Sequence, residues 1–158
     1  MSAPATLDRA GIASRIPHGG TMCLLDRLER WTPGEIDCVA NNHAQVEHPL
    51  RSASGLLAPT AIEYAAQAMA LHGSLVALPG AAPSPGYIAS VRNVRFAALR
   101  LDTVSSELRI HAERLAGGAN EVLYAFRVSD AAGAMLAEGR AAVVLDSPVP
   151  MTAAEGLS

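Results

Sequence analysis

The sequence predicts an α+β fold in which an antiparallel sheet of about six strands wraps around one long helix. Two observations lead to this prediction. A stretch of mostly apolar and small residues, 59–78, has helical spacing, and six segments on either side of it have the features of strands. With 158 residues, 50% of them hydrophobic and 17% charged, the chain has enough apolar material for the core of one domain.

The first two expected strands form a hairpin. They cover residues 22–31 and 35–42, and Thr32-Pro33-Gly34 between them contains the proline and glycine typical of a tight turn. No internal repeat interrupts the order of elements that follows.

The central helix is expected over residues 59–78. Pro59 suits its first turn, small and apolar side chains recur at helical spacing, and Pro79-Gly80 ends it. Apart from Glu63, Gln67 and His72 the helix is apolar or small on nearly every side, so it must be covered by other elements. Its uncharged part, 64–78, is too short for a membrane span.

Four consecutive antiparallel strands are expected after the helix, because four segments alternate polar and apolar residues and two glycine-containing turns lie between them. The strands are expected at 87–96, 103–115, 121–129 and 134–145, and the turns at 117–118 and 130–133. The predicted domain runs from residue 12 to 146. Residues 1–11 are expected to be a flexible N-terminus and residues 147–158 a disordered tail.

Composition and motifs exclude several classes of function. The 12 basic residues are all arginine, so chemistry that depends on a lysine amine is excluded, and the net charge of -3 argues against nucleic-acid binding. The sequence has no GxSxG or GxGxxG motif and no histidine or cysteine pair at metal-ligand spacing, so we expect no metal site. Cys23 and Cys38 are too few for a disulfide framework, and with no secretory segment the sequence indicates a cytoplasmic protein.

Glu63 is the first candidate for a functional residue. It is the only carboxylate within the apolar helix, where burial of a charge is costly and is tolerated most often at functional sites. The alternative is a glutamate at the edge of the helix that reaches solvent, and the residues alone leave the two interpretations nearly even.

His48 is the second candidate, and we expect it in an exposed loop, 46–58, where Pro49 stiffens the chain. A histidine that titrates near neutrality and a carboxylate in an apolar pocket form a competent acid and base pair. A surface histidine without function is the alternative. The first residues of the helix, including Ala58, carry backbone N–H groups that can stabilise an oxyanion.

Several segments together resemble the hotdog-fold 3-hydroxyacyl-acyl-carrier-protein dehydratases, and most closely those of aryl-polyene pathways. The resemblance covers about residues 16–145. It is carried by Ile16-Pro17-His18 with residues 22–28, by His48-Pro49, by residues 57–68 and by residues 86–96. The usual His-Phe-Pro-Gly of the family reads His48-Pro49-Leu50-Arg51 here.

The resemblance implies dehydration of a 3-hydroxyacyl thioester on an acyl carrier protein to the trans-2-enoyl thioester, without cofactor or metal. It implies that His48 takes the C2 proton, that Glu63 protonates the departing hydroxyl, that the Ala58 amide polarises the thioester carbonyl and that Gln67 orients polar groups. His43 is the reserve candidate for the base. In this family the histidine and the carboxylate of one site come from different protomers, which implies a dimer.

The sequence leaves two other functions open. One is a non-catalytic or weakly catalytic hotdog partner subunit of a dehydratase heterodimer, which the altered histidine loop favours. The other is an acyl thioesterase, in which a helical acidic residue acts with water and no loop histidine is needed. Activity that survives the loss of His48 would favour the thioesterase.

Overall fold

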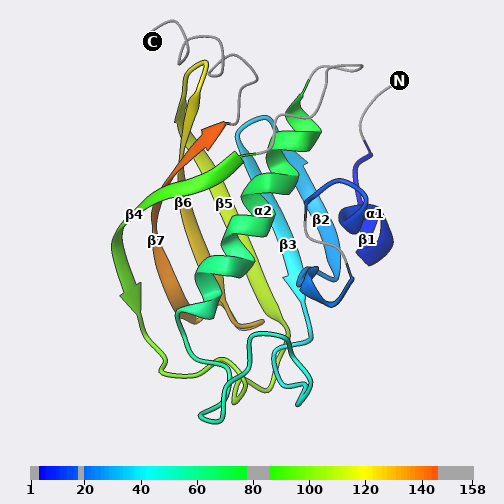
Figure 1. The fold of residues 1–158 in the computed structure, drawn as a ribbon, viewed down its shortest axis with the longest axis vertical. Helices are drawn as coiled ribbons and strands as arrows, with labels where there is room; N and C mark the ends of the chain where they lie inside the picture. Colours follow the sequence, from blue (N-terminus) through cyan, green and yellow to red (C-terminus); the bar gives the residue numbers. More distant parts are fainter. Residues whose placement is uncertain (1–3, 18–19, 78–85, 146–158) are drawn as a thin grey trace, which may run out of the picture.

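The computed structural model describes residues 4–17, 20–77 and 86–145, and it contains an antiparallel sheet and a long helix (Figure 1). The strand order in the sheet is β1-β2-β3-β5-β6-β7-β4. In chain order the elements are β1 (Leu7–Asp8), α1 (Arg9–Ala13), the 3₁₀ helix η1 (Gly20–Met22), β2 (Arg27–Thr32), β3 (Glu35–Ala40), α2 (Thr60–Val76), β4 (Gly86–Phe96), β5 (Leu108–Gly117), β6 (Glu121–Ser129) and β7 (Met135–Leu145).

The predicted hairpin is confirmed as the pair β2 and β3. Thr32 pairs with Glu35, so Pro33 and Gly34 form the loop, and the Gly34 amide donates to Thr32 Oγ1 at 3.1 Å. The first strand is shorter than expected, because residues 20–22 form a 3₁₀ turn and the Leu24 amide donates to the Gln67 side chain. This contact ties the segment before β2 to α2.

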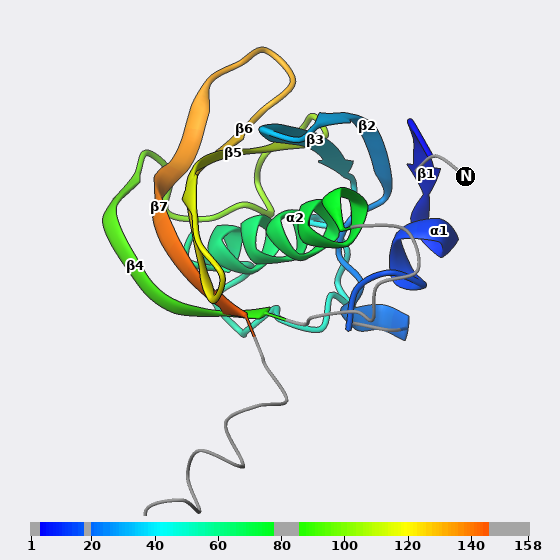
Figure 2. The ribbon, with the colours of Figure 1, turned by 90° about the horizontal axis from the view of Figure 1, so that it is seen from above.

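The predicted helix is confirmed as α2, which lies within the expected range 59–78. Figure 2 shows the sheet curving around α2, and the helix packs against β3, β4, β5 and β6. Its buried positions include Tyr64, Gln67 and His72, so polar groups enter the core together with its alanines and leucines. None of the helices in the described part of the chain is long and apolar enough to cross a membrane.

The four strands after the helix are antiparallel, as expected. Tight connections at 118–120 and 130–134 join β5, β6 and β7 as neighbours. By contrast, β4 pairs with β7 at the sheet edge, with Ile88 opposite Val143. The longer connection 97–107 allows β4 to occupy this distant edge. Strand β5 begins at Leu108 and not at 103, because Ser106 turns its hydroxyl to the Ala131 amide at 3.0 Å.

The seventh strand, β1, lies in the segment that was expected to be a flexible N-terminus. Leu7 pairs with Leu28 of β2, α1 follows immediately, and its Ile12 is fully buried. Trp31 Nε1 donates to the Pro4 carbonyl at 2.7 Å. Residues 4–11, the described part of this segment, therefore make specific contacts with the rest of the fold. The expected tail 147–158 lies outside the described residues, and the domain limits stay a prediction.

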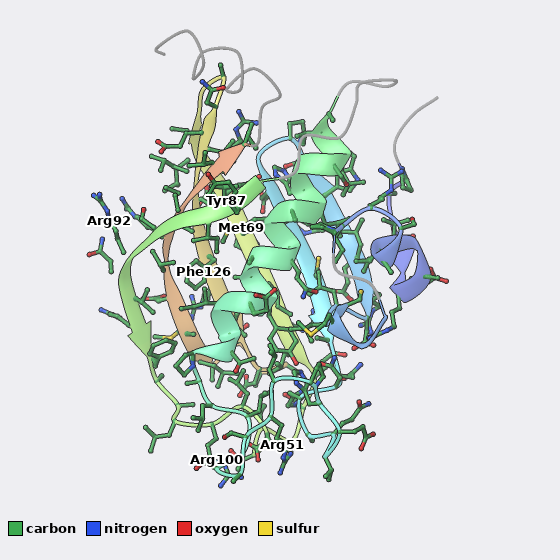
Figure 3. All side chains as sticks on the ribbon, viewed as in Figure 1. Arg51, Met69, Tyr87, Arg92, Arg100 and Phe126 are labelled. Carbon is green, nitrogen blue, oxygen red and sulfur yellow. The ribbon has the colours of Figure 1, made fainter. Side chains whose placement is uncertain are left out.

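Two loops meet at the N-terminal end of α2, where Figure 3 labels Arg51 and Arg100. The Leu101 amide donates to the Leu56 carbonyl at 2.7 Å, so the β4–β5 loop pairs with the segment that leads into α2. Asp102, whose side chain is only 5% exposed, accepts hydrogen bonds from the Leu56 amide at 3.0 Å and from Arg100 Nε at 3.1 Å, and it forms an ion pair with Arg51. Asp102 therefore holds the loop that contains His48 against the loop after β4.

Gly55→Ala is expected to destabilise the protein by about 1 kcal/mol or more, since it adds a Cβ where the backbone requires glycine. Gly55 has φ +102, and a Cβ there would lie 2.7 Å from Arg100 Nε and 2.8 Å from Asp102 Oδ1. Gly73→Ala is the matched control. Gly73 is exposed on α2 with nothing within 4 Å of an added Cβ, so this change should stabilise by about 0.5–1 kcal/mol. Urea denaturation of both variants measures the effects, and equal stabilities would contradict the packing described for Gly55.

Asp102→Asn is expected to lower the melting temperature at neutral pH. The hydrogen bond from Arg100 is the main cause that holds the pKa of Asp102 far below its usual range, with further help from the Leu56 amide. A depressed carboxyl pKa stabilises the fold above the unfolded pKa, and this stabilisation is lost as the pH falls below about 4. The melting temperatures of parent and variant should therefore converge on acidification. A difference that stays constant from neutral to acidic pH would contradict this role.

Candidate active site

Glu63 lies in the first turn of α2, half-buried, and the buried Gln67 holds it. Gln67 Nε2 donates to Glu63 Oε2 at 3.2 Å and to the Met22 carbonyl at 2.7 Å, while its Oε1 accepts from the Leu24 amide at 2.8 Å. Since the segment 22–24 fixes both ends of the Gln67 amide, Gln67 fixes the position of the carboxylate. The positive end of the helix dipole favours a carboxylate at this position.

His48 lies in the loop between β3 and α2, as expected, but it is buried, with only 4% exposed, where the sequence predicted an exposed side chain. Its Nδ1 accepts from the Leu50 amide at 3.1 Å, and its Nε2 lies 3.0 Å from the Tyr64 hydroxyl. The expectation of an exposed histidine is wrong, because α2 presents Tyr64 to this loop. His48 therefore contributes to the stability of the fold.

The environment of His48 favours the neutral ring. Burial is the main cause that lowers its pKa, and the electrostatic effects of nearby His43 and Arg51 lower it further. At neutral pH the ring is therefore uncharged, which is the state that a general base requires.

Within this chain His48 and Glu63 have different neighbours. His48 contacts Tyr64, Glu63 contacts Gln67, and consecutive positions of a helix point about 100° apart. The prediction that the histidine and the carboxylate of one site come from two protomers fits this arrangement and stays a prediction.

The Ala58 amide has a partner inside the chain, which corrects the role expected for it. It donates to the Leu99 carbonyl at 3.0 Å, as part of the bridge between Leu57 and Arg100. The next amides, of Thr60 and Ala61, donate to carbonyls three residues back. Because the β4–β5 loop lies against this segment, the Ala58 amide is not directed at a thioester carbonyl in this structure.

His43, the reserve candidate, is also buried. Its Nε2 donates to the Val104 carbonyl at 3.0 Å, and its Nδ1 is buried without a hydrogen-bond partner among the described residues. Among the described residues, His43 is therefore held by its Nε2 alone.

Two residues of this region, Tyr64 and Asn42, were not among the sequence candidates. The Tyr64 hydroxyl contacts His48 and donates to Asn42 Oδ1 at 2.6 Å, and both side chains are buried. The only sequence signal for Tyr64 is an aromatic hydroxyl inside an apolar helix, next to Glu63. Asn42 lies two residues after the end of β3, and its role depends on a contact with Tyr64, 22 residues away.

Glu35, Asp37 and His111 place possible metal-ligand atoms within 4.8 Å of one another on β3 and β5. Arg30 forms ion pairs with both carboxylates, at 3.1 Å to Glu35 and 2.9 Å to Asp37, so its guanidinium already offsets part of their negative charge. It lies on the face of the sheet that is turned away from α2, because the neighbouring Ile110 and Ala112 of β5 point into the core.

A family model described as ApeP-like, ApeP dehydratase, matches residues 10–153. This match places the chain in a class of dehydratases. The chain belongs to the ApeP dehydratase family. A search of curated proteins gave no match.

Solved structures support the fold. The chain is similar to the dehydratase heterocomplex ApeI:P from Xenorhabdus doucetiae, with 21% identity, a TM-score of 0.79, and coverage of 90% of this chain and 95% of that chain. It is also similar to thioesterase HI1161 from Haemophilus influenzae, with 14% identity, a TM-score of 0.63, and coverage of 92% and 94%. The PaaI protein of E. coli shares 12% identity with a TM-score of 0.56 over 74% of this chain and 80% of that one. An antiparallel sheet curved around a helix, together with these neighbours, fits the α+β hotdog class.

Proposed function

We propose that this chain dehydrates a 3-hydroxyacyl thioester carried on an acyl carrier protein and forms the trans-2-enoyl thioester. Membership of the ApeP dehydratase family supports the reaction type. The observation that carries the site is the Glu63 carboxylate, held by the buried Gln67 at the first turn of α2. The cytoplasmic location inferred from the sequence belongs to this proposal.

In the proposed reaction, His48 removes the proton from C2, and the electron pair of that C–H bond forms the C2–C3 double bond. The hydroxyl on C3 leaves with a proton from Glu63 as water, so the atoms balance without a cofactor. Gln67 keeps the Glu63 carboxyl oriented toward the leaving hydroxyl. Because His48 and Glu63 have different neighbours in one chain, a complete site combines His48 of one subunit with Glu63 of another.

A second candidate function is that of a hotdog partner subunit in a dehydratase heterodimer. Both ring nitrogens of His48 are engaged inside the chain, and this favours a chain that contributes Glu63 to a site whose histidine belongs to another hotdog subunit. The similar ApeI:P structure is a heterocomplex. Turnover by the chain alone, compared with turnover after addition of a second hotdog dehydratase subunit, distinguishes the two functions.

The purified chain is expected to self-associate at micromolar concentration. Strand β4 is at the edge of the sheet, where its unpaired backbone groups can hydrogen-bond to the same strand of a second copy. Light scattering measures the mass in solution. A monomer would contradict a site shared between two copies of this chain, and a dimer that forms only with another hotdog subunit would favour the second candidate function.

A further inference from the structure

A chain of hydrogen bonds runs through the buried side chains around His48. The Leu50 amide donates to His48 Nδ1 at 3.1 Å, His48 Nε2 lies 3.0 Å from the Tyr64 hydroxyl oxygen, and the Tyr64 hydroxyl donates to Asn42 Oδ1 at 2.6 Å. Of these side chains, Tyr64 is fully buried and His48 and Asn42 nearly so. Water therefore has little access to these polar groups, and they depend on one another for partners.

Only one arrangement of protons satisfies this chain. A backbone amide can only donate, so Nδ1 of His48 must hold a lone pair, and the single proton of the neutral ring is then on Nε2. Tyr64 gives its own proton to Asn42, so its oxygen accepts the Nε2–H of His48. If the ring proton moved to Nδ1, it would face the Leu50 N–H, and two donors would oppose each other.

We propose that Tyr64, supported by Asn42, is a positioning residue: its hydroxyl oxygen accepts the Nε2–H of His48 and keeps the ring in the orientation in which the Leu50 amide fixes the proton on Nε2. Its importance for catalysis rests on the proposed function, in which His48 is the base. In the arrangement described, the Leu50 amide occupies the lone pair on Nδ1, and Nε2 is protonated and faces Tyr64. His48 therefore takes a proton from substrate, on Nδ1, only after its ring turns away from the Leu50 amide.

A second buried histidine on α2 shows how much the arrangement at His48 depends on its tyrosine. His72 is fully buried, its Nε2–H donates to the Thr32 carbonyl at 2.8 Å, and its Nδ1 accepts from the Tyr124 hydroxyl at 2.8 Å. At His72 a backbone carbonyl accepts the ring proton, whereas at His48 this acceptor is Tyr64. Tyr124→Phe is therefore a matched control, because it removes the same hydroxyl beside a buried histidine of the same helix.

The test is nuclear magnetic resonance of the histidine rings in the full-length, ¹⁵N-labelled chain. The parent should show His48 with a protonated Nε2, an unprotonated Nδ1 and an Nε2–H that is protected from exchange with water. In Tyr64→Phe this proton should exchange about tenfold faster, the size expected for the loss of one hydrogen bond. Tyr124→Phe should change the signals of His72 and leave those of His48 as in the parent.

A parent spectrum with the proton on Nδ1 of His48 would overturn the proposal, and so would a Tyr64→Phe protein whose His48 signals are unchanged. If Tyr64→Phe does not fold, Asn42→Ala replaces it. That change removes the acceptor of the Tyr64 proton, so His48 Nε2–H should exchange faster, and an unchanged rate counts against the proposal. None of these readouts uses turnover. A protein with the expected spectrum but without dehydratase activity would contradict the proposed function and leave the role of Tyr64 standing.

Discussion

Glu63→Gln is expected to lose most of its turnover, by about 10²- to 10⁴-fold, the range typical of a general acid. Glutamine keeps the volume of the side chain, and its amide oxygen can still accept the hydrogen bond from Gln67 Nε2, but it cannot transfer a proton. Because Glu63 is half-buried, the amide also avoids the desolvation of a carboxylate, so the variant should fold as well as the parent or better. Steady-state rates and a thermal melt on the same preparation measure both effects.

Glu113→Gln is the control for Glu63→Gln, because Glu113 of β5 is exposed, next to the buried Ala112, and its side chain lies on the face of the sheet turned away from α2. It should leave both turnover and melting temperature near the parent values. A Glu63→Gln protein that melts at a lower temperature but remains active would show that Glu63 is structural, and would overturn its assignment as the acid.

His48→Ala is expected to abolish dehydration and also to destabilise the fold. Loss of a general base reduces the rate by about 10²- to 10⁴-fold. The structural cost arises because the Leu50 amide and the Tyr64 hydroxyl lose their buried partner, and each buried polar group left unpaired costs about 1–3 kcal/mol. Turnover and urea denaturation measure the two effects separately.

His43→Ala is the comparison that decides which histidine is the base. His43 loses one hydrogen bond to the Val104 carbonyl, so a moderate loss of stability is expected, with turnover retained if His48 is the base. Full activity in His48→Ala together with an inactive His43→Ala would transfer the role to His43. Activity that survives both changes would favour the thioesterase chemistry considered from the sequence.

The sequence predicted those elements of the fold that depend on a local pattern of residues. The helix and the hairpin were found because the spacing of small and apolar residues and the Pro33-Gly34 turn are contained in short segments. The pairing of β4 with β7 does not follow from local pattern, because the two strands are about 50 residues apart in the chain. Likewise β1 forms only because Leu7 meets Leu28, which no local signal in residues 1–11 indicates.

At the candidate site, too, the sequence predicts contacts within one element but not contacts between distant segments. Glu63 and Gln67 lie one helical turn apart, so their contact follows from spacing alone. The burial of His48 depends on its contact with Tyr64, 16 residues further along the chain, and the engagement of the Ala58 amide depends on the carbonyl of Leu99, 41 residues further along. These two expectations failed because tertiary contacts, and not the loop sequence itself, decide which polar groups are already paired.

The most direct test of the proposed function is incubation of the purified chain, and of its Glu63→Gln variant, with a 3-hydroxyacyl-acyl carrier protein, followed by mass spectrometry of the carrier. The parent is expected to convert the acyl group to the trans-2-enoyl form, with loss of one water and the thioester intact. Glu63→Gln is expected to leave the substrate unchanged. Release of the free acid and the free carrier thiol by the parent would contradict dehydration and identify a thioesterase.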